Sequence, residues 1–185
     1  MSNSTDNMAA LKRLLLDRSV KRGSFVLASG KHSDIYVDAR LTTMSPEGML
    51  IIGKLGLAMI LEHGWHPDSI GGLTMGADPV AFAISHTSAL EGSPLRAFSV
   101  RKETKAHGTG NQIEGPFQKG DRVVVIEDVI TTGKSAIQAI DAIERFGGDI
   151  LGVLAVVDRQ DGGREAIGAR GYEVVALTNM GDLKT

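Results

Sequence analysis

Residues 123–135, VVVIEDVITTGKS, decide how this chain is expected to fold and where it is expected to bind a ligand. A run of apolar residues leads into two adjacent acids, Glu127 and Asp128, and a small polar turn follows almost at once. A buried strand that ends in a turn and opens a helix presents backbone N–H groups at the helix start, where the helix dipole favours anions. The turn therefore predicts an anion site, and the acids predict a ligand that also donates hydrogen bonds.

A ribose 5-phosphate satisfies both halves of this pattern. Amide and hydroxyl groups of the turn would hold the phosphate, and the carboxylates would accept hydrogen bonds from sugar hydroxyls. The GKS triplet invites comparison with the nucleotide-binding P-loop, G-x-x-x-x-G-K-[ST], but the first glycine of that motif would fall on Asp128. The remaining alternative is a capped helix after a buried strand, with acids that are merely solvated.

Apolar runs and helical patterns alternate along most of the chain. Strands are expected at 69–74, 95–101, 122–128, 150–158 and 172–178, and helices at 46–63, 78–92, 134–148 and 163–169. Apolar strands that are each followed by a helix predict a parallel α/β sheet covered on both faces. Ligands of such sheets bind beyond the carboxyl ends of the strands, where the polar, glycine-bearing segments lie. These segments are 74–78, 101–110, 127–135 and 158–163.

The first 45 or so residues are expected to form a hood over this site. A helix at 7–20 and two short strands at 24–30 and 33–40 precede the helix that starts at Pro46. No linker or internal repeat is evident, so 1–185 is expected to be a single domain, with a core at 46–185.

The composition excludes several classes of protein. Glycine accounts for 23 of 185 residues, about 12% against a usual ~7%, and it clusters in separate turns. The net charge of −2 without a basic stripe argues against nucleic acid as the main partner. The chain has no cysteine, no signal-like amino end and no long apolar segment, so we expect a cytoplasmic protein that does not bind membranes.

The motif at 123–135 resembles the motif with which type I phosphoribosyltransferases bind 5-phosphoribosyl 1-pyrophosphate (PRPP). From about residue 20 to 180 the chain is similar to orotate phosphoribosyltransferases in particular. The resemblance implies that the acids bind the ribose hydroxyls, that the turn binds the 5-phosphate, and that Asp128 is catalytic. The implied PRPP-binding residues are Glu127, Asp128, Val129, Ile130, Thr131, Thr132, Gly133, Lys134 and Ser135.

A second candidate segment is the loop RKETKAHGTGNQIEG, residues 101–115. Its cations could meet a pyrophosphate, and its glycines would let it close as a lid that excludes water. A solvated surface loop is the alternative. The spacing R-K-x-x-K-x-H-G-T-G resembles the catalytic loop of orotate phosphoribosyltransferases, which reaches the neighbouring subunit's site in a homodimer. By that resemblance Arg101, Lys102, Lys105 and His107 bind PRPP, and Lys105 and His107 are catalytic.

The residues that would contact the base and the pyrophosphate follow neighbouring strands of the predicted sheet. Arg159 follows the strand at 150–158, and its planar guanidinium suits a carboxylate. The resemblance places Arg159 and Thr131 on orotate, residues 74–78 on pyrophosphate, and Tyr36 in the hood over the base. Met75 and Ala28 stand where several relatives have lysine, and Lys31 is a possible compensation.

Magnesium is implied as the cofactor, held mainly through PRPP oxygens and water rather than by protein ligands. Four histidines are scattered without ligand spacing and are expected at the surface: His32, His63, His66 and His86. The reaction implied is transfer of ribose 5-phosphate from PRPP to orotate, giving orotidine 5′-monophosphate and pyrophosphate in UMP biosynthesis. The alternatives are transfer to another base, such as a purine, and a non-catalytic PRPP sensor.

Overall fold

The computed structural model describes residues 4–26, 32–103 and 112–184. Within these residues a six-stranded sheet has the order β5-β4-β3-β6-β7-β8. Its neighbouring strands are parallel except β5, which pairs antiparallel with β4. The strands are β3 (Ser69–Leu73), β4 (Arg96–Val100), β5 (Ile113–Glu114), β6 (Arg122–Ile130), β7 (Asp149–Asp158) and β8 (Val174–Asn179). This arrangement confirms the predicted fold class.

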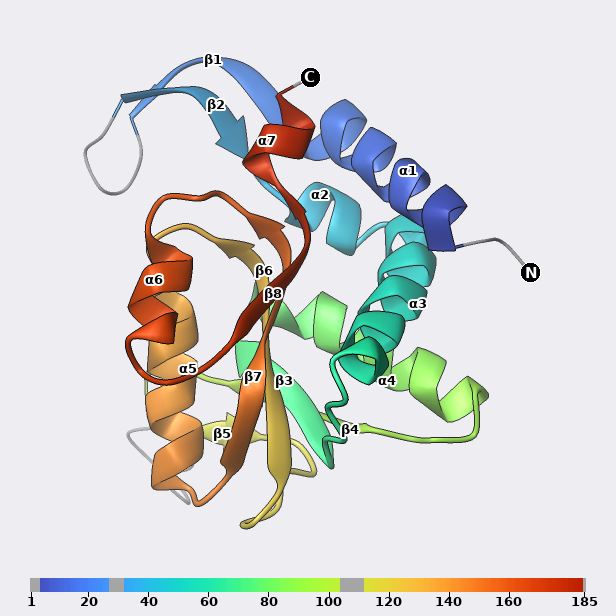
Figure 1. Cartoon of the computed structure of the whole chain (residues 1–185), viewed down its shortest axis with the longest axis vertical. Helices are drawn as coiled ribbons and strands as arrows, with labels where there is room; N and C mark the ends of the chain where they lie inside the picture. The colour runs from blue at the N-terminus through green and yellow to red at the C-terminus, as the bar shows by residue number, and fades with distance from the viewer. Residues whose placement is uncertain (1–3, 27–31, 104–111, 185) are drawn as a thin grey trace.

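Helices cover both faces of the sheet (Figure 1). On one face lie α1 (Ser4–Leu14), α3 (Pro46–Glu62) and α4 (Ala77–Leu90), and on the other lie α5 (Lys134–Arg145) and α6 (Gly163–Gly168). The start of α3 shows why the sequence folds this way locally. Pro46 occupies the first turn, and the Ser45 hydroxyl accepts a hydrogen bond of 3.1 Å from the N–H of Gly48. Such a cap stabilises a helix by roughly 1 kcal/mol.

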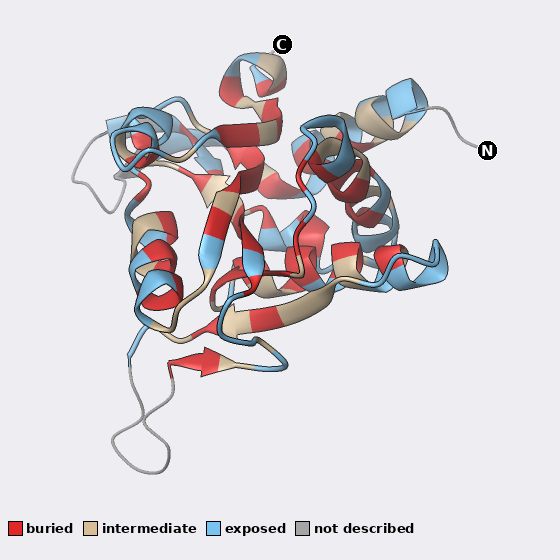
Figure 2. Cartoon of the chain, turned by 60° about the horizontal axis from the view of Figure 1, so that its bottom comes forward, coloured by how far each residue is buried: buried red, intermediate tan, exposed pale blue. Residues whose placement is uncertain are grey.

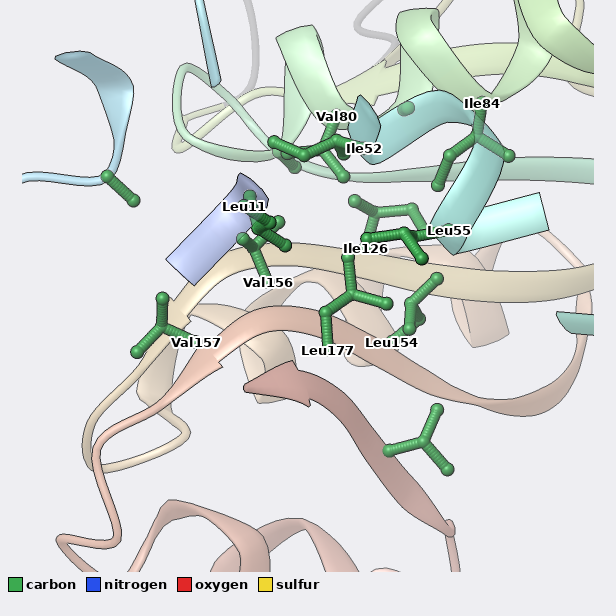
Figure 3. Close-up of a cluster of buried hydrophobic side chains, with 14 of the residues drawn as sticks. Leu11, Ile52, Leu55, Val80, Ile84, Ile126, Leu154, Val156, Val157 and Leu177 are labelled. Carbon is green, nitrogen blue, oxygen red and sulfur yellow. The ribbon is translucent and has the colours of Figure 1, made fainter. Parts of the chain in front are cut away.

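Strand β6 runs through the centre of the molecule (Figure 1), and its residues 123–127 are all buried. The helices around the sheet are buried on their inner sides and exposed on their outer sides (Figure 2). The side chains of Val124 and Ile126 pack with α3 and α4, and Figure 3 shows Ile126 among Ile52, Leu55 and Leu154. Val123 and Val125 pack on the opposite side, with residues of α5. The position of β6 therefore explains its continuous apolar run, from which a strand buried on both faces was predicted.

The amino-terminal hood lies above the carboxyl ends of the central strands (Figure 1). Helix α1 continues into a π-helical turn at Leu15–Ser19, and an antiparallel pair follows, with Val20 opposite Val37. This hood contains β1 (Val20–Val26), β2 (His32–Val37) and the short helix α2 (Arg40–Thr43), and α7 (Met180–Leu183) packs beside it. Leu11 and Leu15 are fully buried in the cluster that α3 and α4 share with the sheet, so the hood is anchored to the core.

The order of the strands reverses between β3 and β6. The chain moves outward from β3 to β4 and β5, then returns to β6 and moves the other way to β7 and β8. The pairing of β3 with β6 covers only Ser69–Gly71 and Val123–Val125, whereas β6 stays paired with β7 as far as Ile130. Ligands of open α/β sheets bind at such a switch point, beyond the carboxyl ends of the strands.

Several predicted boundaries were wrong in the hood. The predicted helix at 7–20 begins earlier, at Ser4, and its last residues, Leu15–Ser19, form a π-helical turn. The predicted strand at 24–30 starts at Val20 instead. The predicted strand at 33–40 ends at Val37, because Arg40 already begins α2. Strand β5 and helix α7 were not predicted at all. No helix in the described part of the chain is both long enough and apolar enough to cross a membrane.

Candidate active site

The turn after β6 forms a small pocket at the start of α5. Gly133 caps the helix with a φ of 77°, a conformation that favours glycine, and a Cβ there would lie 2.9 Å from the carbonyl oxygen of Gly163. The pocket has a volume of about 80 Å³ and is lined by Glu127 and by residues 129–136. It combines backbone N–H groups at a helix start, threonine and serine hydroxyls, and Lys134, which is the chemistry of a phosphate site.

A larger cavity of about 680 Å³ opens beside this pocket at the switch point. Its walls come from the ends of β3, β4, β6 and β7 and from the hood. It is lined by Tyr36, Val37, Asp38, Ala39, Arg40, Leu73, Thr74, Met75, Gly76, Lys102, Glu127, Asp128, Val129, Thr131, Thr132, Lys134, Ser135 and Arg159. Glu127 and residues of the turn line both spaces, so one ligand can occupy the two together.

Glu127 and Asp128 differ in their surroundings. Glu127 is only 5% exposed, and its Oε1 is buried without a hydrogen-bond partner among the described residues. Burial raises the pKa of Glu127 well above its usual value, and the neighbouring charge of Asp128 adds to that rise. Burial also raises the pKa of Asp128, but hydrogen bonding from the N–H of Val129, 2.8 Å from Oδ1, opposes the rise. A ligand hydroxyl donating to Glu127 would supply the missing partner.

Arg159 is held at the end of β7 with its side chain only 9% exposed. Its backbone N–H donates a 2.9 Å hydrogen bond to the carbonyl oxygen of Ile130, which fixes it level with the phosphate turn. The Nε atom lies 3.4 Å from Oδ2 of Asp161, yet it makes no hydrogen bond within the described residues. An ion-pair distance without hydrogen-bond geometry leaves a buried cation that can still bind an anion or a carbonyl oxygen.

The segment that follows β3 forms another wall of the large cavity. Thr74, Met75 and Gly76 line it, and the Thr74–Met75 peptide bond is cis. Gly76 packs against Asp128, because a Cβ at this position would lie 2.5 Å from Oδ1 of that residue. Asp78 does not line the cavity, and its Oδ2 accepts a 2.6 Å hydrogen bond from the hydroxyl of Thr74.

The lid candidates are placed unequally. Lys102 lines the large cavity, while its carbonyl oxygen accepts a 2.7 Å hydrogen bond from Nε2 of Gln138. Arg101 does not line the cavity: its Nε donates to Oε1 of Glu114 at 2.8 Å across the base of the lid. Lys105 and His107 lie outside the described residues, as do Ala28 and Lys31.

Two charged residues of the large cavity were not predicted from the sequence. Asp38 and Arg40 line its hood side, although the segment that contains them was interpreted only as the end of a strand. The four scattered histidines are all exposed, as expected. No group of three or more His, Cys, Asp or Glu side chains is arranged to hold a metal ion in 4–26, 32–103 and 112–184.

The chain is similar to known proteins over nearly its whole length. Residues 45–172 match the family model described as "Phosphoribosyl transferase domain". The orotate phosphoribosyltransferase of Aquifex aeolicus is 46% identical over 176 residues, which cover 94% of this chain and 95% of that protein.

Solved structures of the Mycobacterium tuberculosis orotate phosphoribosyltransferase are also similar. The complex with Fe(III) dicitrate has a TM-score of 0.86 at 42% identity, and the complex with PRPP a TM-score of 0.81 at 40% identity. In both comparisons the match covers 97% of this chain and 99% of that one. With this similarity and an anion pocket at the sheet's switch point, the chain belongs to the phosphoribosyltransferase family, among the orotate phosphoribosyltransferases.

Proposed function

We propose that this enzyme transfers the ribose 5-phosphate group of PRPP to orotate in the presence of Mg²⁺, giving orotidine 5′-monophosphate and pyrophosphate for UMP synthesis. One observation carries the proposal. A phosphate-sized pocket shares Glu127 with a larger cavity that holds a buried arginine. One continuous space therefore contains a matching group for the phosphate, for the ribose hydroxyls and for a base that carries a carboxylate.

The ribose phosphate is expected at the end of β6. Backbone N–H groups from Val129 to Ser135 and the dipole of α5 would hold the 5-phosphate. Glu127 and Asp128 would accept hydrogen bonds from the two ribose hydroxyls, which supports the proposal because Glu127 Oε1 has no partner within the described residues. Held at both ends, the ribose presents its anomeric carbon to the wide part of the cavity, where the base enters.

Orotate is expected between Thr131 and Arg159. The buried guanidinium of Arg159 suits the orotate carboxylate or a ring carbonyl oxygen, and the hood residue Tyr36 lines the same cavity. A purine lacks a carboxylate and would offer no second anion to this arginine, whose Nε makes no hydrogen bond within the described residues. The position of Arg159 therefore favours orotate over a purine as the acceptor.

Pyrophosphate is expected along residues 74–76 of the large cavity. No covalent nucleophile is required, because the reaction needs charge compensation of the leaving pyrophosphate and a positioned base nitrogen. Lys105 and His107 are proposed to protonate and neutralise the leaving group, with Lys102 at the entrance of the cavity. Mg²⁺, when bound, would neutralise pyrophosphate oxygens, and the carboxylates of Glu127 and Asp128 fit a metal held mainly through substrate oxygens and water.

We also propose a homodimer in which the lid of one subunit serves the site of the other. Beside the site, three exposed apolar side chains line a hollow together with Asp38, Arg40 and Ser45; they are Leu41, Met44 and Met75. Exposed apolar side chains next to a site support an interface with a second copy. A cytoplasmic location remains a prediction from the sequence.

The assay that tests the reaction is the loss of orotate absorbance after addition of PRPP, with and without Mg²⁺. A panel of purine and pyrimidine bases under the same conditions identifies the acceptor. Turnover with orotate, and with none of the other bases of the panel, supports the proposal. Turnover with a purine and not with orotate would reassign the base, and PRPP binding without turnover of any base would identify a sensor.

A further inference from the structure

Asp38 and Arg40 form a forked ion pair on the hood side of the cavity. Nε of Arg40 donates to Oδ1 of Asp38 at 2.8 Å, and its Nη2 donates to Oδ2 at 3.0 Å. The backbone N–H of Arg40 also lies 3.2 Å from Oδ1. Asp38 thus fixes the plane of the guanidinium, because two parallel hydrogen bonds leave it little freedom to rotate.

The pair leaves one edge of the guanidinium available. Asp38 uses Nε and one N–H of Nη2, while Nη1 has no hydrogen-bond partner in the described part of the chain. The side chain of Arg40 is 46% exposed, so its outer edge faces open space. An edge formed by Nη1 and Nη2 matches two oxygens of a phosphate group.

The position of the pair connects it with the segment after β3. Asp38, Arg40 and Met75 all line both the large cavity and the adjoining hollow of about 480 Å³. Met75 is 59% exposed and carries no charge, so the segment at 74–76 brings no cation of its own to this side. Lys102, Lys134 and Arg159 also line the large cavity, but among the described residues Arg40 is the one cation that lines the adjoining hollow together with Met75.

The electrostatics agree with this placement. The hydrogen bonds to Asp38 raise the pKa of Arg40, and the negative charge of Asp128 adds to that rise. For Asp128, burial raises the pKa, and the charge of Arg40 is among the influences that oppose the rise. The guanidinium therefore interacts electrostatically with the acid assigned to the ribose, and both residues line the same large cavity.

We propose that Arg40, oriented by Asp38, binds the pyrophosphate group of PRPP on the side where the protein presents the uncharged Met75. This inference rests on the proposed function, since it assigns one more binding residue to the same reaction. The opposite interpretation is that the pair only caps α2 and neutralises itself. The two interpretations differ in which ligand loses affinity when Arg40 is changed.

Calorimetry can distinguish the two interpretations of the ion pair. The affinities of three ligands are measured in the presence of Mg²⁺: PRPP, pyrophosphate and ribose 5-phosphate. In Arg40→Gln, the affinities for PRPP and pyrophosphate should fall about tenfold, because a charge-assisted contact is lost at a half-exposed site. The affinity for ribose 5-phosphate should stay within about twofold, because this ligand has no pyrophosphate. In Arg40→Gln/Met75→Lys, a new cation on the facing segment should recover most of the pyrophosphate affinity.

Arg122→Gln is the matched control. Arg122 also forms a forked pair, with Asp68, but at the opposite end of the sheet, and its replacement should change none of the three affinities. Unchanged pyrophosphate affinity in Arg40→Gln, or an equal loss for ribose 5-phosphate, would overturn the inference. If the wild-type protein binds no PRPP, the proposed function fails with it, whereas PRPP binding that is equal in both proteins refutes only the role of Arg40.

Discussion

Replacement of Gly76 by alanine should separate stability from activity. Gly76 lies at the amino end of α4 with φ −64° and ψ −43°, a conformation that alanine adopts without strain. Alanine has fewer conformations than glycine in the unfolded chain, which stabilises a compatible site by roughly 0.4–1 kcal/mol. The backbone therefore gives no reason for Gly76→Ala to unfold.

The new methyl group would instead collide with Asp128. It would lie 2.5 Å from Oδ1, 2.8 Å from Cγ and 2.9 Å from Oδ2, all shorter than an ordinary contact between heavy atoms. To restore a contact of 3.4 Å, the carboxylate has to retreat by about 0.9 Å. A misplacement of roughly 1 Å in a positioned group costs on the order of a hundredfold in rate, or about 2.7 kcal/mol in the activation free energy.

Two measurements check this prediction: thermal unfolding, and orotate turnover at saturating and limiting PRPP. Gly76→Ala should unfold at or slightly above the wild-type temperature while kcat/KM for PRPP falls about a hundredfold. Gly168→Ala is the control, because a Cβ at that exposed position meets nothing within 4 Å. Full activity in Gly76→Ala would refute the assignment of Asp128 to the ribose. A large drop in the unfolding temperature would show that the backbone shifts instead of the carboxylate.

Three further experiments test the acids, the base and the lid. Burial raises the pKa of Glu127 in the folded protein, so its contribution to stability is present below the unfolded pKa and lost as pH rises through the folded one. The unfolding temperature of Glu127→Gln should therefore rise relative to that of the wild type as pH rises above the usual pKa of a glutamate, while activity is lost. A difference in unfolding temperature that does not change with pH would contradict the shift. Arg159→Ala should cost roughly 2–5 kcal/mol with orotate and leave PRPP binding near wild type, and equal losses would indicate a structural arginine. Lys105→Ala and Asp128→Asn should each be nearly inactive, and their exchanged mixture should recover about a quarter of wild-type activity, since half the dimers are mixed and each has one complete site. Confirmed exchange without recovery would mean that the lid serves its own subunit.

The parts of the fold that were predictable are those with strong local patterns. Strand β6, its turn and α5 follow from a continuous apolar run, a glycine turn and a helical period, so each element is specified by its own residues. Strand β5 has only Ile113 and Glu114, too few residues for any period to be visible. Helix α2 is a single turn that begins at Arg40, directly after a strand pattern, and therefore looked like its continuation.

Most of the candidate site was predictable because its residues also lie in strong local patterns, but two of its features were not predicted. Glu127, Asp128 and the turn lie together in the sequence, and Arg159 follows the next strand of the sheet. Asp38 and Arg40 are only two positions apart in the sequence, where they look like ordinary solvated charges. Their place in the cavity depends on the position of the hood over the sheet, which the sequence does not reveal. The pairing of Arg101 with Glu114 depends on how the ends of a long loop meet, which the spacing of residues does not determine.

Two buried groups of the cavity that lack hydrogen-bond partners among the described residues show why stability and function are opposed at this site. Oε1 of Glu127 and Nε of Arg159 lie at the ends of adjacent strands, and each lacks a hydrogen-bond partner within the described residues. A buried polar group without a partner costs about 1–3 kcal/mol, and more when it is charged. One group needs a donor and the other an acceptor, so no single simple anion or cation relieves both. A sugar hydroxyl satisfies the first and a base carboxylate the second. Each substrate should therefore raise the unfolding temperature when it binds alone, PRPP through the end of β6 and orotate through the end of β7.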